Sequence, residues 1–141
     1  MRIDDTDRKL LTLLMKDGRQ SFASLGQRVG LSTAATKRRI DRLRRDRVIR
    51  GFGADVDPQA LGWNIEAFVE LYCNGHIPPE KMKELAAKIP EVYDAYTVTG
   101  EADGILVVRC TDAAHLEQVL GAIRLHHDVL RTRSAIILTH L

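Results

Sequence analysis

Residues 29–45 read VGLSTAATKRRIDRLRR, and this stretch decides the fold of the N-terminal half. Gly30 accepts a positive φ angle at little cost, and Ser32 is a good N-cap for a helix that follows it. The inward-facing positions of that helix then recur at i, i+4 and i+7: Thr36, Ile40 and Leu43. The spacing predicts a helix over residues 33–45 that begins after a short turn containing glycine.

Two further helices are predicted before this turn. Asp4 can cap the first, which carries leucines at helical spacing and stops near Gly18. Ser21 can cap the second, whose apolar face is formed by Phe22, Leu25 and Val29. Two short helices joined by a three-residue turn with glycine form the helix-turn-helix pattern. We therefore predict a winged-helix-like, three-helix DNA-binding domain over residues 1–50.

The outward face of the third helix is basic. Residues 33–50 hold eight Lys/Arg against two Asp. In a helix-turn-helix, the second helix of the motif places its N-terminal residues at base edges in the major groove. The expected base contacts are Thr33, Ala34, Lys37 and Arg38. The expected phosphate contacts are Arg28, Arg42, Arg44, Arg45 and Arg50. For any one of these arginines the alternative is an ordinary solvated helix surface.

The charge of the chain is divided unevenly between its halves. Residues 1–50 carry 14 Lys/Arg and 6 Asp/Glu, whereas residues 51–141 carry 7 Lys/Arg and 13 Asp/Glu. This asymmetry indicates that the first half meets a polyanion and the second does not.

The C-terminal half has a different pattern. We expect a linker with a short strand over residues 51–63, followed by a second domain over residues 64–141. Its predicted elements are a strand at 65–73, a helix between Pro78 and Pro90, strands at 92–99 and 105–110, a helix after Asp112, and a strand at 129–139. The order β-α-β-β-α-β is the ferredoxin-like arrangement, a four-stranded antiparallel sheet with two helices on one face. The fold class is therefore α+β.

The second face of such a sheet has no helix to cover it. We expect Phe68, Tyr72, Leu106 and Val108 to lie there. Because a large apolar face in water is unusual for a monomer, it predicts self-association into at least a dimer.

Other classes of protein are not favoured. No apolar run reaches the roughly 20 residues that cross a bilayer, and no secretory signal is visible, so a cytoplasmic protein is expected. Cys73 and Cys110 have no CxxC neighbour and indicate buried thiols. No cofactor motif appears. His126 and His127 are adjacent and should point to different sides of a helix, so no metal site is expected.

The whole chain resembles the leucine-responsive regulatory protein/AsnC family, the feast/famine regulators of bacteria and archaea. The motifs that carry the resemblance are DDTDRKLL at 4–11, DGR at 17–19, VGLS at 29–32, RIDRL at 39–43, VIRGF at 48–52, LG at 61–62, TGEAD at 99–103 and RTRSAIIL at 131–138. The resemblance implies dimers that assemble into octamers, and an amino acid as the usual effector.

By the same resemblance, the effector site lies between neighbouring domains at one turn: Thr99, Gly100, Glu101, Ala102 and Asp103. Backbone N–H groups around Gly100 are suited to an α-carboxylate, and Asp103 to an α-ammonium. The alternative is a plain hairpin loop.

Three positions depart from the family pattern. Arg47 stands where glycine is usual, just past the third helix. Ala102 and Gly104 are small where a bulky residue is common. Gly26 replaces the usual alanine, which is expected to weaken the second helix by up to about 1 kcal/mol.

These observations predict a sequence-specific, nucleoid-associated transcription regulator whose assembly or DNA binding responds to an amino acid or similar molecule. The alternative is an architectural, chromatin-like DNA-binding protein that needs no effector. An enzyme is not expected: tetrapyrrole decarboxylases have a similar two-domain fold, but this chain has no nucleophile pair, phosphate loop or metal motif.

Overall fold

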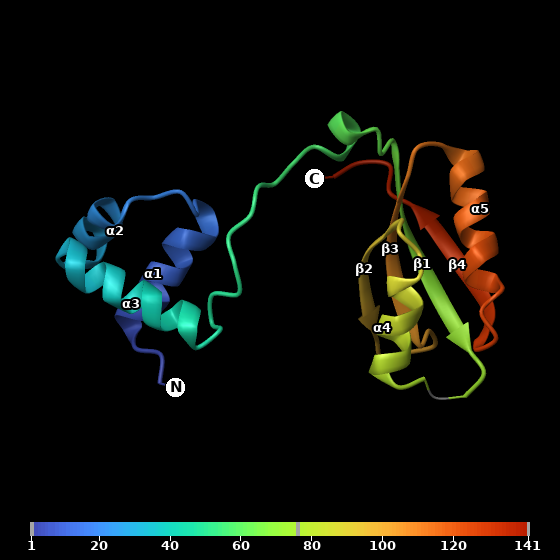
Figure 1. Ribbon diagram of the computed structural model, residues 1–141, viewed down its shortest axis with the longest axis horizontal. Coiled ribbons are helices and arrows are strands. Elements are labelled where there is room, and N and C mark those ends of the chain that lie inside the picture. Colours follow the sequence, from blue (N-terminus) through green and yellow to red (C-terminus); the bar gives the residue numbers. More distant parts are fainter. Residues whose placement is uncertain (1, 76, 141) are drawn as a thin grey trace. The chain divides into compact units, whose positions relative to one another are not determined.

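The computed structural model describes residues 2–75 and 77–140, and it divides the chain into two compact units, residues 1–55 and 56–141 (Figure 1). The expected boundary near residue 50 thus falls close to the end of the first unit. No helix in the described part of the chain has the length and apolar character needed to cross a membrane.

The first unit consists of three helices: α1 (Asp5–Lys16), α2 (Phe22–Val29) and α3 (Thr33–Arg45). Each begins at the predicted cap. The Asp4 carboxylate accepts a hydrogen bond from the Asp7 N–H at 2.8 Å, and the Ser21 and Ser32 hydroxyls cap α2 and α3 in the same way. The prediction of a three-helix helix-turn-helix unit is confirmed.

The centre of this unit combines an apolar cluster with one buried carboxylate. Leu10, Leu25 and Ile40 form the apolar cluster. The side chain of Asp7 is 0% exposed, and its oxygens accept hydrogen bonds from the guanidinium groups of Arg39 and Arg42 on α3. Because a buried charge is tolerated only when paired, this cluster fixes α1 against α3.

Two of the departures from the family pattern have a structural explanation. A Cβ on Gly26 would lie 2.5 Å from the Leu31 carbonyl oxygen and 2.9 Å from the Thr36 hydroxyl. The expected cost to α2 thus has a packing reason, since an alanine would collide with the turn and with the start of α3. Arg47 adopts the left-handed conformation, with φ 55°, and takes the bend that glycine usually takes.

The short strand expected between residues 51 and 57 does not form, and this prediction was wrong. The segment is irregular up to η1 (Pro58–Leu61), a 3-10 turn capped by the Asp57 carboxylate. A strand needs a partner for its backbone groups, and none of the described strands pairs with this segment. Gly51 and Gly53 also weaken any extended conformation here.

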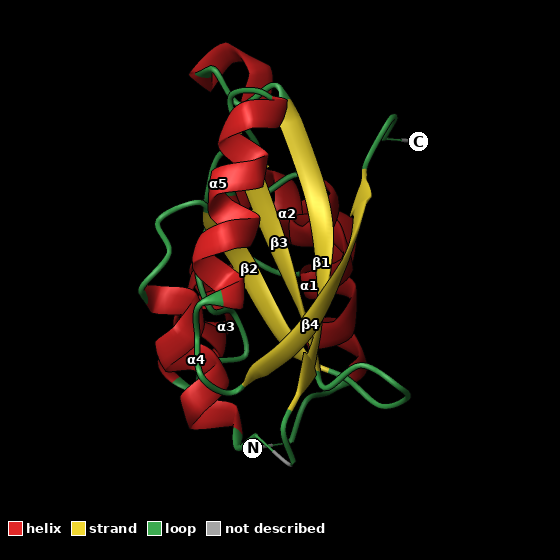
Figure 2. Ribbon diagram, turned by 90° about the vertical axis from the view of Figure 1, so that its right-hand side faces the viewer, coloured by secondary structure: helices red, strands yellow, loops and turns green. Residues whose placement is uncertain are grey.

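The second unit is ferredoxin-like, as predicted. Its elements are β1 (Ile65–Cys73), α4 (Pro79–Ala87), β2 (Val92–Thr97), β3 (Gly104–Cys110), α5 (Ala113–Arg124) and β4 (Val129–Ile136). The strands pair antiparallel in the order β2-β3-β1-β4. Figure 2 shows α4 and α5 on one face of the sheet. The strands β2 and β4 end two and three residues earlier than expected.

The two faces of the sheet carry different side chains from those expected. Leu106 and Val108 are fully buried in the core beneath the helices, together with Val69 and Leu71 of β1. Their assignment to the uncovered face was wrong, because alternation along β3 places Ile105, Val107 and Arg109 there instead. The register pairs Phe68 with Val107 and Glu70 with Ile105, which puts Phe68 and Tyr72 on the uncovered face as predicted.

The buried carboxylate gives a test of how the first unit is held together. We expect Asp7→Ala to lower the free energy of unfolding by about 2–3 kcal/mol, because two guanidinium groups lose their shared partner. The cost is below that of a fully buried pair, since both arginines keep some contact with water. Urea unfolding followed by circular dichroism measures it. Asp5→Ala removes an exposed carboxylate from the same helical turn and should change stability by no more than about 0.5 kcal/mol. Equal effects of the two substitutions would contradict the assignment.

Candidate DNA-binding surface and effector site

The start of α3 presents four exposed side chains. Thr33, Ala34, Lys37 and Arg38 are all exposed, and the first two are small enough to permit close approach of the helix to another surface. Lys37 Nζ lies 2.7 Å from Asp41 Oδ2 one turn later. A pair this exposed contributes little stability, so Lys37 can exchange this partner for another acceptor at low cost.

The arginines expected to contact phosphate fall into two groups. Arg28, Arg44, Arg45 and Arg50 are exposed. Arg42 differs, because its guanidinium is directed inward to Asp7. The structure thus gives Arg42 a partner inside the unit, which the helical periodicity of α3 alone did not indicate.

Arg39 and Asp7 are the important residues that the sequence analysis missed. Arg39 donates to Asp4 Oδ2 at 2.6 Å and to Asp7 Oδ1 at 2.9 Å. Its hydrogen bond lowers the pKa of Asp4 below the ordinary value, and the two carboxylates raise the pKa of Arg39. The sequence contains a signal for this contact. The spacing i, i+3 separates the two acidic residues 4 and 7, and the same spacing separates the two arginines 39 and 42.

The uncovered face of the sheet in the second unit is partly apolar and partly charged. Phe68 of β1 lies at the centre of this face and is 45% exposed. Tyr96 of β2 lies on the same face and is 49% exposed. Around them lie ion pairs between neighbouring strands: Arg109 Nε is 2.7 Å from Glu66 Oε2, and Arg133 Nε is 2.7 Å from Glu70 Oε2. This is the face that we expected to take part in self-association.

The turn that follows β2 is anchored to β1 by Asp103. The Asp103 N–H donates to the Leu71 carbonyl at 2.9 Å, and the Cys73 N–H donates to Asp103 Oδ2 at 2.8 Å. Gly100 has φ 120°, a conformation that favours glycine. The carboxylate of Asp103 that we expected to face a ligand ammonium is thus partly occupied in holding the turn.

The same turn separates two hollows. One, of about 780 Å³, is lined by Glu70, Tyr72, Thr97, Val98, Thr99, Glu101, Ala102, Ile105 and Arg133. The other, of about 380 Å³, is lined by Ile77, Pro79, Thr97, Val98, Thr99, Gly100, Ala102 and Asp103. All five residues expected at the effector site therefore border a hollow, and Thr99 and Ala102 border both.

Two charged groups in the larger hollow, Glu70 and Arg133, are already paired with each other. Hydrogen bonds from Arg133 and Tyr72 lower the pKa of Glu70, and this carboxylate in turn raises the pKa of Tyr72. Glu101 is exposed and borders the same hollow. Glu101 is therefore a carboxylate placed to meet a ligand cation.

Neither cysteine is set up as a nucleophile. Burial, together with the nearby Asp103 and Asp128 carboxylates, raises the pKa of the Cys73 thiol to about 11. Burial likewise raises the pKa of Cys110. Since the thiolate is the reactive form, the raised pKa values disfavour reaction of either thiol at neutral pH. Cys110 is buried, as expected, whereas Cys73 is only partly buried.

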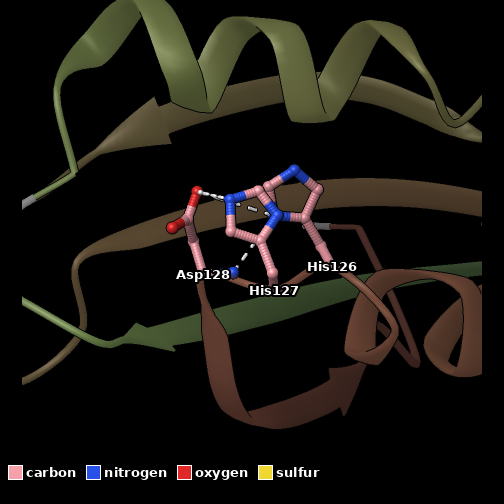
Figure 3. Close-up of side chains that lie close together, drawn as sticks. All are labelled: His126, His127 and Asp128. Atoms are coloured by element: carbon pink, nitrogen blue, oxygen red, sulfur yellow. Dashed lines mark hydrogen bonds and ion pairs between the residues drawn. The ribbon is translucent and has the colours of Figure 1, made fainter.

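The histidine pair does not lie on a helix, contrary to expectation. The helix α5 ends at Arg124, and His126 and His127 lie in the turn before β4 (Figure 3). Their rings stack with centroids 4.7 Å apart, and both approach the Asp128 carboxylate. The reason given for excluding a metal site, divergence of the two rings, was therefore wrong.

Comparison with known protein families assigns both units. Residues 3–44 match the AsnC-type helix-turn-helix domain, and residues 66–141 match the Lrp/AsnC ligand binding domain. The two matches coincide with the helical unit and with the ferredoxin-like unit.

Similar proteins cover almost the entire chain. The HTH-type transcriptional regulator Rv2324 of Mycobacterium tuberculosis is 46% identical over 99% of this chain and 95% of its own length. The regulator LrpA of the same organism is 38% identical over 96% of this chain and 90% of its own. These relatives are regulators and not enzymes, which supports the prediction that this chain is not an enzyme.

Solved structures agree with the fold throughout. A feast or famine regulatory protein (Rv3291c) from M. tuberculosis, complexed with L-methionine, has a TM-score of 0.89 and 37% identity over 99% of this chain and 94% of its own. The regulator NMB0573 from Neisseria meningitidis, in complex with L-Met, has a TM-score of 0.88 and 27% identity over 99% and 92%. The chain belongs to the Lrp/AsnC family of DNA-binding transcription regulators.

Proposed function

We propose that this regulator reads DNA through the start of α3 and responds to an amino acid held beside the turn at residues 99–103. The observation that carries the proposal is the exposed stripe of α3. Within it Lys37 pairs only with the exposed Asp41 on the same helix, whereas Arg39 and Arg42 are bound to the buried Asp7.

For the DNA complex, we assign sequence reading to Lys37 and Arg38. Both side chains reach guanine O6 and N7 from a helix in the major groove, and the methyl groups of Thr33 and Ala34 suit a thymine methyl. Arg28, Arg44, Arg45 and Arg50 contact phosphate groups and set the register. Arg42 supports the complex indirectly, because it fixes α3 to α1 through Asp7.

For the effector, we assign an α-amino acid. The two related structures named above hold L-methionine. Here the backbone N–H groups around Gly100, which borders the smaller hollow, are suited to the α-carboxylate. Glu101 is the better partner for the α-ammonium, because Asp103 Oδ2 already accepts the Cys73 N–H. The small side chain of Ala102 leaves space between the two hollows for the side chain of the effector.

For the assembly, we propose dimers that join into an octamer, with the uncovered sheet face as one contact between copies. An exposed phenylalanine and tyrosine amid ion pairs are typical of an interface with an apolar centre and a polar rim. Dimers also suit DNA, since paired recognition helices read half-sites about 34 Å apart. We place the protein in the cytoplasm, associated with the nucleoid.

The DNA assignment is tested with a duplex selected from a random library and a scrambled duplex. Lys37→Ala combined with Arg38→Ala should weaken binding to the selected duplex by about 10- to 100-fold and bring the ratio of the two affinities close to one. Fluorescence anisotropy at fixed salt measures both affinities. The control, Lys9→Ala with Lys16→Ala on α1, removes the same charge and should preserve the ratio. A ratio unaffected by the α3 substitutions would refute base reading by these residues. A ratio near one in the wild type would favour the architectural alternative.

The effector assignment is tested by thermal shift against the twenty amino acids at millimolar concentration. At least one should raise the melting temperature, because a ligand that binds only the folded state stabilises it. Ala102→Leu fills both hollows and should abolish the shift. Ala122→Leu, an equal enlargement on an exposed position of α5, should retain it. An unchanged shift in Ala102→Leu, or no shift in the wild type, would contradict the proposal.

The assembly is tested by light scattering coupled to gel filtration. Phe68→Glu places a charge at the centre of the uncovered face and should reduce the mass of the particle to a smaller assembly. Leu125→Glu places the same charge on a more exposed apolar side chain just after α5 and should leave the mass unchanged. If Phe68→Glu folds normally and keeps the wild-type mass, this face is not a contact between copies.

A further inference from the structure

The turn between α5 and β4 gathers three side chains with metal-binding atoms. His126 Nδ1, His127 Nε2 and Asp128 Oδ2 come from consecutive residues and lie within 4.8 Å of one another (Figure 3). In residues 2–75 and 77–140, no other group of three or more His, Cys, Asp or Glu side chains has its donor atoms this close together. We propose that this turn binds a divalent transition-metal ion, with Zn²⁺ as the representative case.

The distances between the donor atoms fit a single ion. Asp128 Oδ2 lies 3.2 Å from His127 Nε2 and 3.8 Å from His126 Nδ1. Zinc binds imidazole nitrogen and carboxylate oxygen at roughly 2.0–2.2 Å, so tetrahedral ligands lie about 3.3–3.5 Å apart. The three donors need only small side-chain rotations to reach that spacing, and the fourth position remains open to water.

The oxygen at the centre of the group has no hydrogen bond to satisfy it. Asp128 Oδ2 is buried, and no donor in residues 2–75 or 77–140 has the direction that a hydrogen bond to it requires. A buried acceptor left in this way costs free energy, and such groups in folded proteins call for an unseen partner. A bound cation supplies that partner and neutralises the carboxylate.

The ring of His126 must exchange one hydrogen bond for the ion. Its Nδ1 accepts a long hydrogen bond, 3.4 Å, from the Asp128 N–H, and a bond of this length is weak enough to be replaced by a metal ligand bond. His127 stacks on that ring with a 23° angle between the planes, and its side chain is 79% exposed. Binding therefore costs one weak hydrogen bond at His126, and His127 is free to rotate onto an ion from solvent.

The backbone around the three ligands is well fixed. The His126 N–H donates to the Ile123 carbonyl at 3.2 Å, and the Val129 N–H donates to the His126 carbonyl at 2.9 Å. The Asp128 carbonyl accepts a hydrogen bond from the Asn74 N–H at 3.0 Å, which ties the turn to the end of β1. A ligand set on such a frame loses little conformational entropy when the ion binds.

The ligand chemistry selects the class of metal. Two imidazoles and one carboxylate suit Zn²⁺, Co²⁺ and Ni²⁺, whereas Mg²⁺ and Ca²⁺ require mainly oxygen ligands. The ion would lie at the start of β4, the strand that carries Arg133 to the effector hollow. None of its three residues belongs to the proposed DNA or effector contacts, and its test does not depend on them.

The test uses the full chain without a histidine tag, with Zn²⁺ titrated by calorimetry and Co²⁺ followed by its visible absorption. The wild type should bind one ion per chain, and the Co²⁺ spectrum should show ligand-field bands of a site with nitrogen ligands. His127→Ala should weaken Zn²⁺ binding by at least about 10-fold, because one of three protein ligands is lost. His140→Ala is the matched control on another exposed histidine, and it should bind as the wild type does.

A second substitution tests the role of Asp128. Asp128→Asn keeps the size of the side chain but removes its charge, and should also weaken binding, with the fold checked by circular dichroism. Fewer than one ion per chain in the wild type would overturn the proposal. So would Zn²⁺ binding by His127→Ala that is as tight as that of the His140→Ala control. In either case DNA binding and the thermal shift with amino acids would be unaffected, so failure here is distinguishable from failure of the proposed function.

Discussion

The interaction on which the first unit depends is the pairing of Asp7 with Arg39 and Arg42. A carboxylate with no exposed surface is tolerated only because two guanidinium groups on α3 satisfy both of its oxygens. The same carboxylate closes the capping box at the start of α1, where Asp7 Oδ2 accepts the Asp4 N–H. One side chain thus begins α1 and sets its distance and rotation relative to α3. The basic face of α3 points outward because two of its arginines are held inward.

The second unit uses a carboxylate in a comparable way. Asp103 follows the turn that borders the two hollows, and its main chain and side chain both bond to the end of β1. These two hydrogen bonds fix the point at which the turn leads into β3, while Thr99, Gly100 and Glu101 remain exposed. In both units a carboxylate holds the framework: Asp7 in the first, and in the second Asp103, which we had expected to meet a ligand. Their exposed neighbours are left for binding.

The parts of this structure that sequence could predict are local. Caps, helix faces and strand order follow from residues a few positions apart, so α1 to α3 and the ferredoxin-like order were predicted correctly. The failures involve partners distant in sequence. Leu106 and Val108 were placed on the wrong face because a strand that is apolar on both sides gives no parity signal. Residues 51–57 resemble a strand locally but find no partner. The His126–His127 pair depends on where α5 ends, and Leu125 gives no clear stop signal. The inward direction of Arg39 and Arg42 required knowledge of how α1 packs.

Two positions that depart from the family pattern, Gly26 and Arg47, set where α3 begins and ends. Gly26 lets α2 approach the start of α3, and Arg47 turns the chain sharply after its end, with the Val48 N–H donating to the Leu43 carbonyl. The helix is therefore limited to 13 residues, roughly 20 Å at 1.5 Å per residue. Lys37 and Arg44 are then about 10 Å apart along its axis. On the proposed docking, with the start of the helix in the groove, that separation carries the later arginines away from the base edges and towards the phosphates. The division between reading and positioning thus follows from where the helix begins and ends.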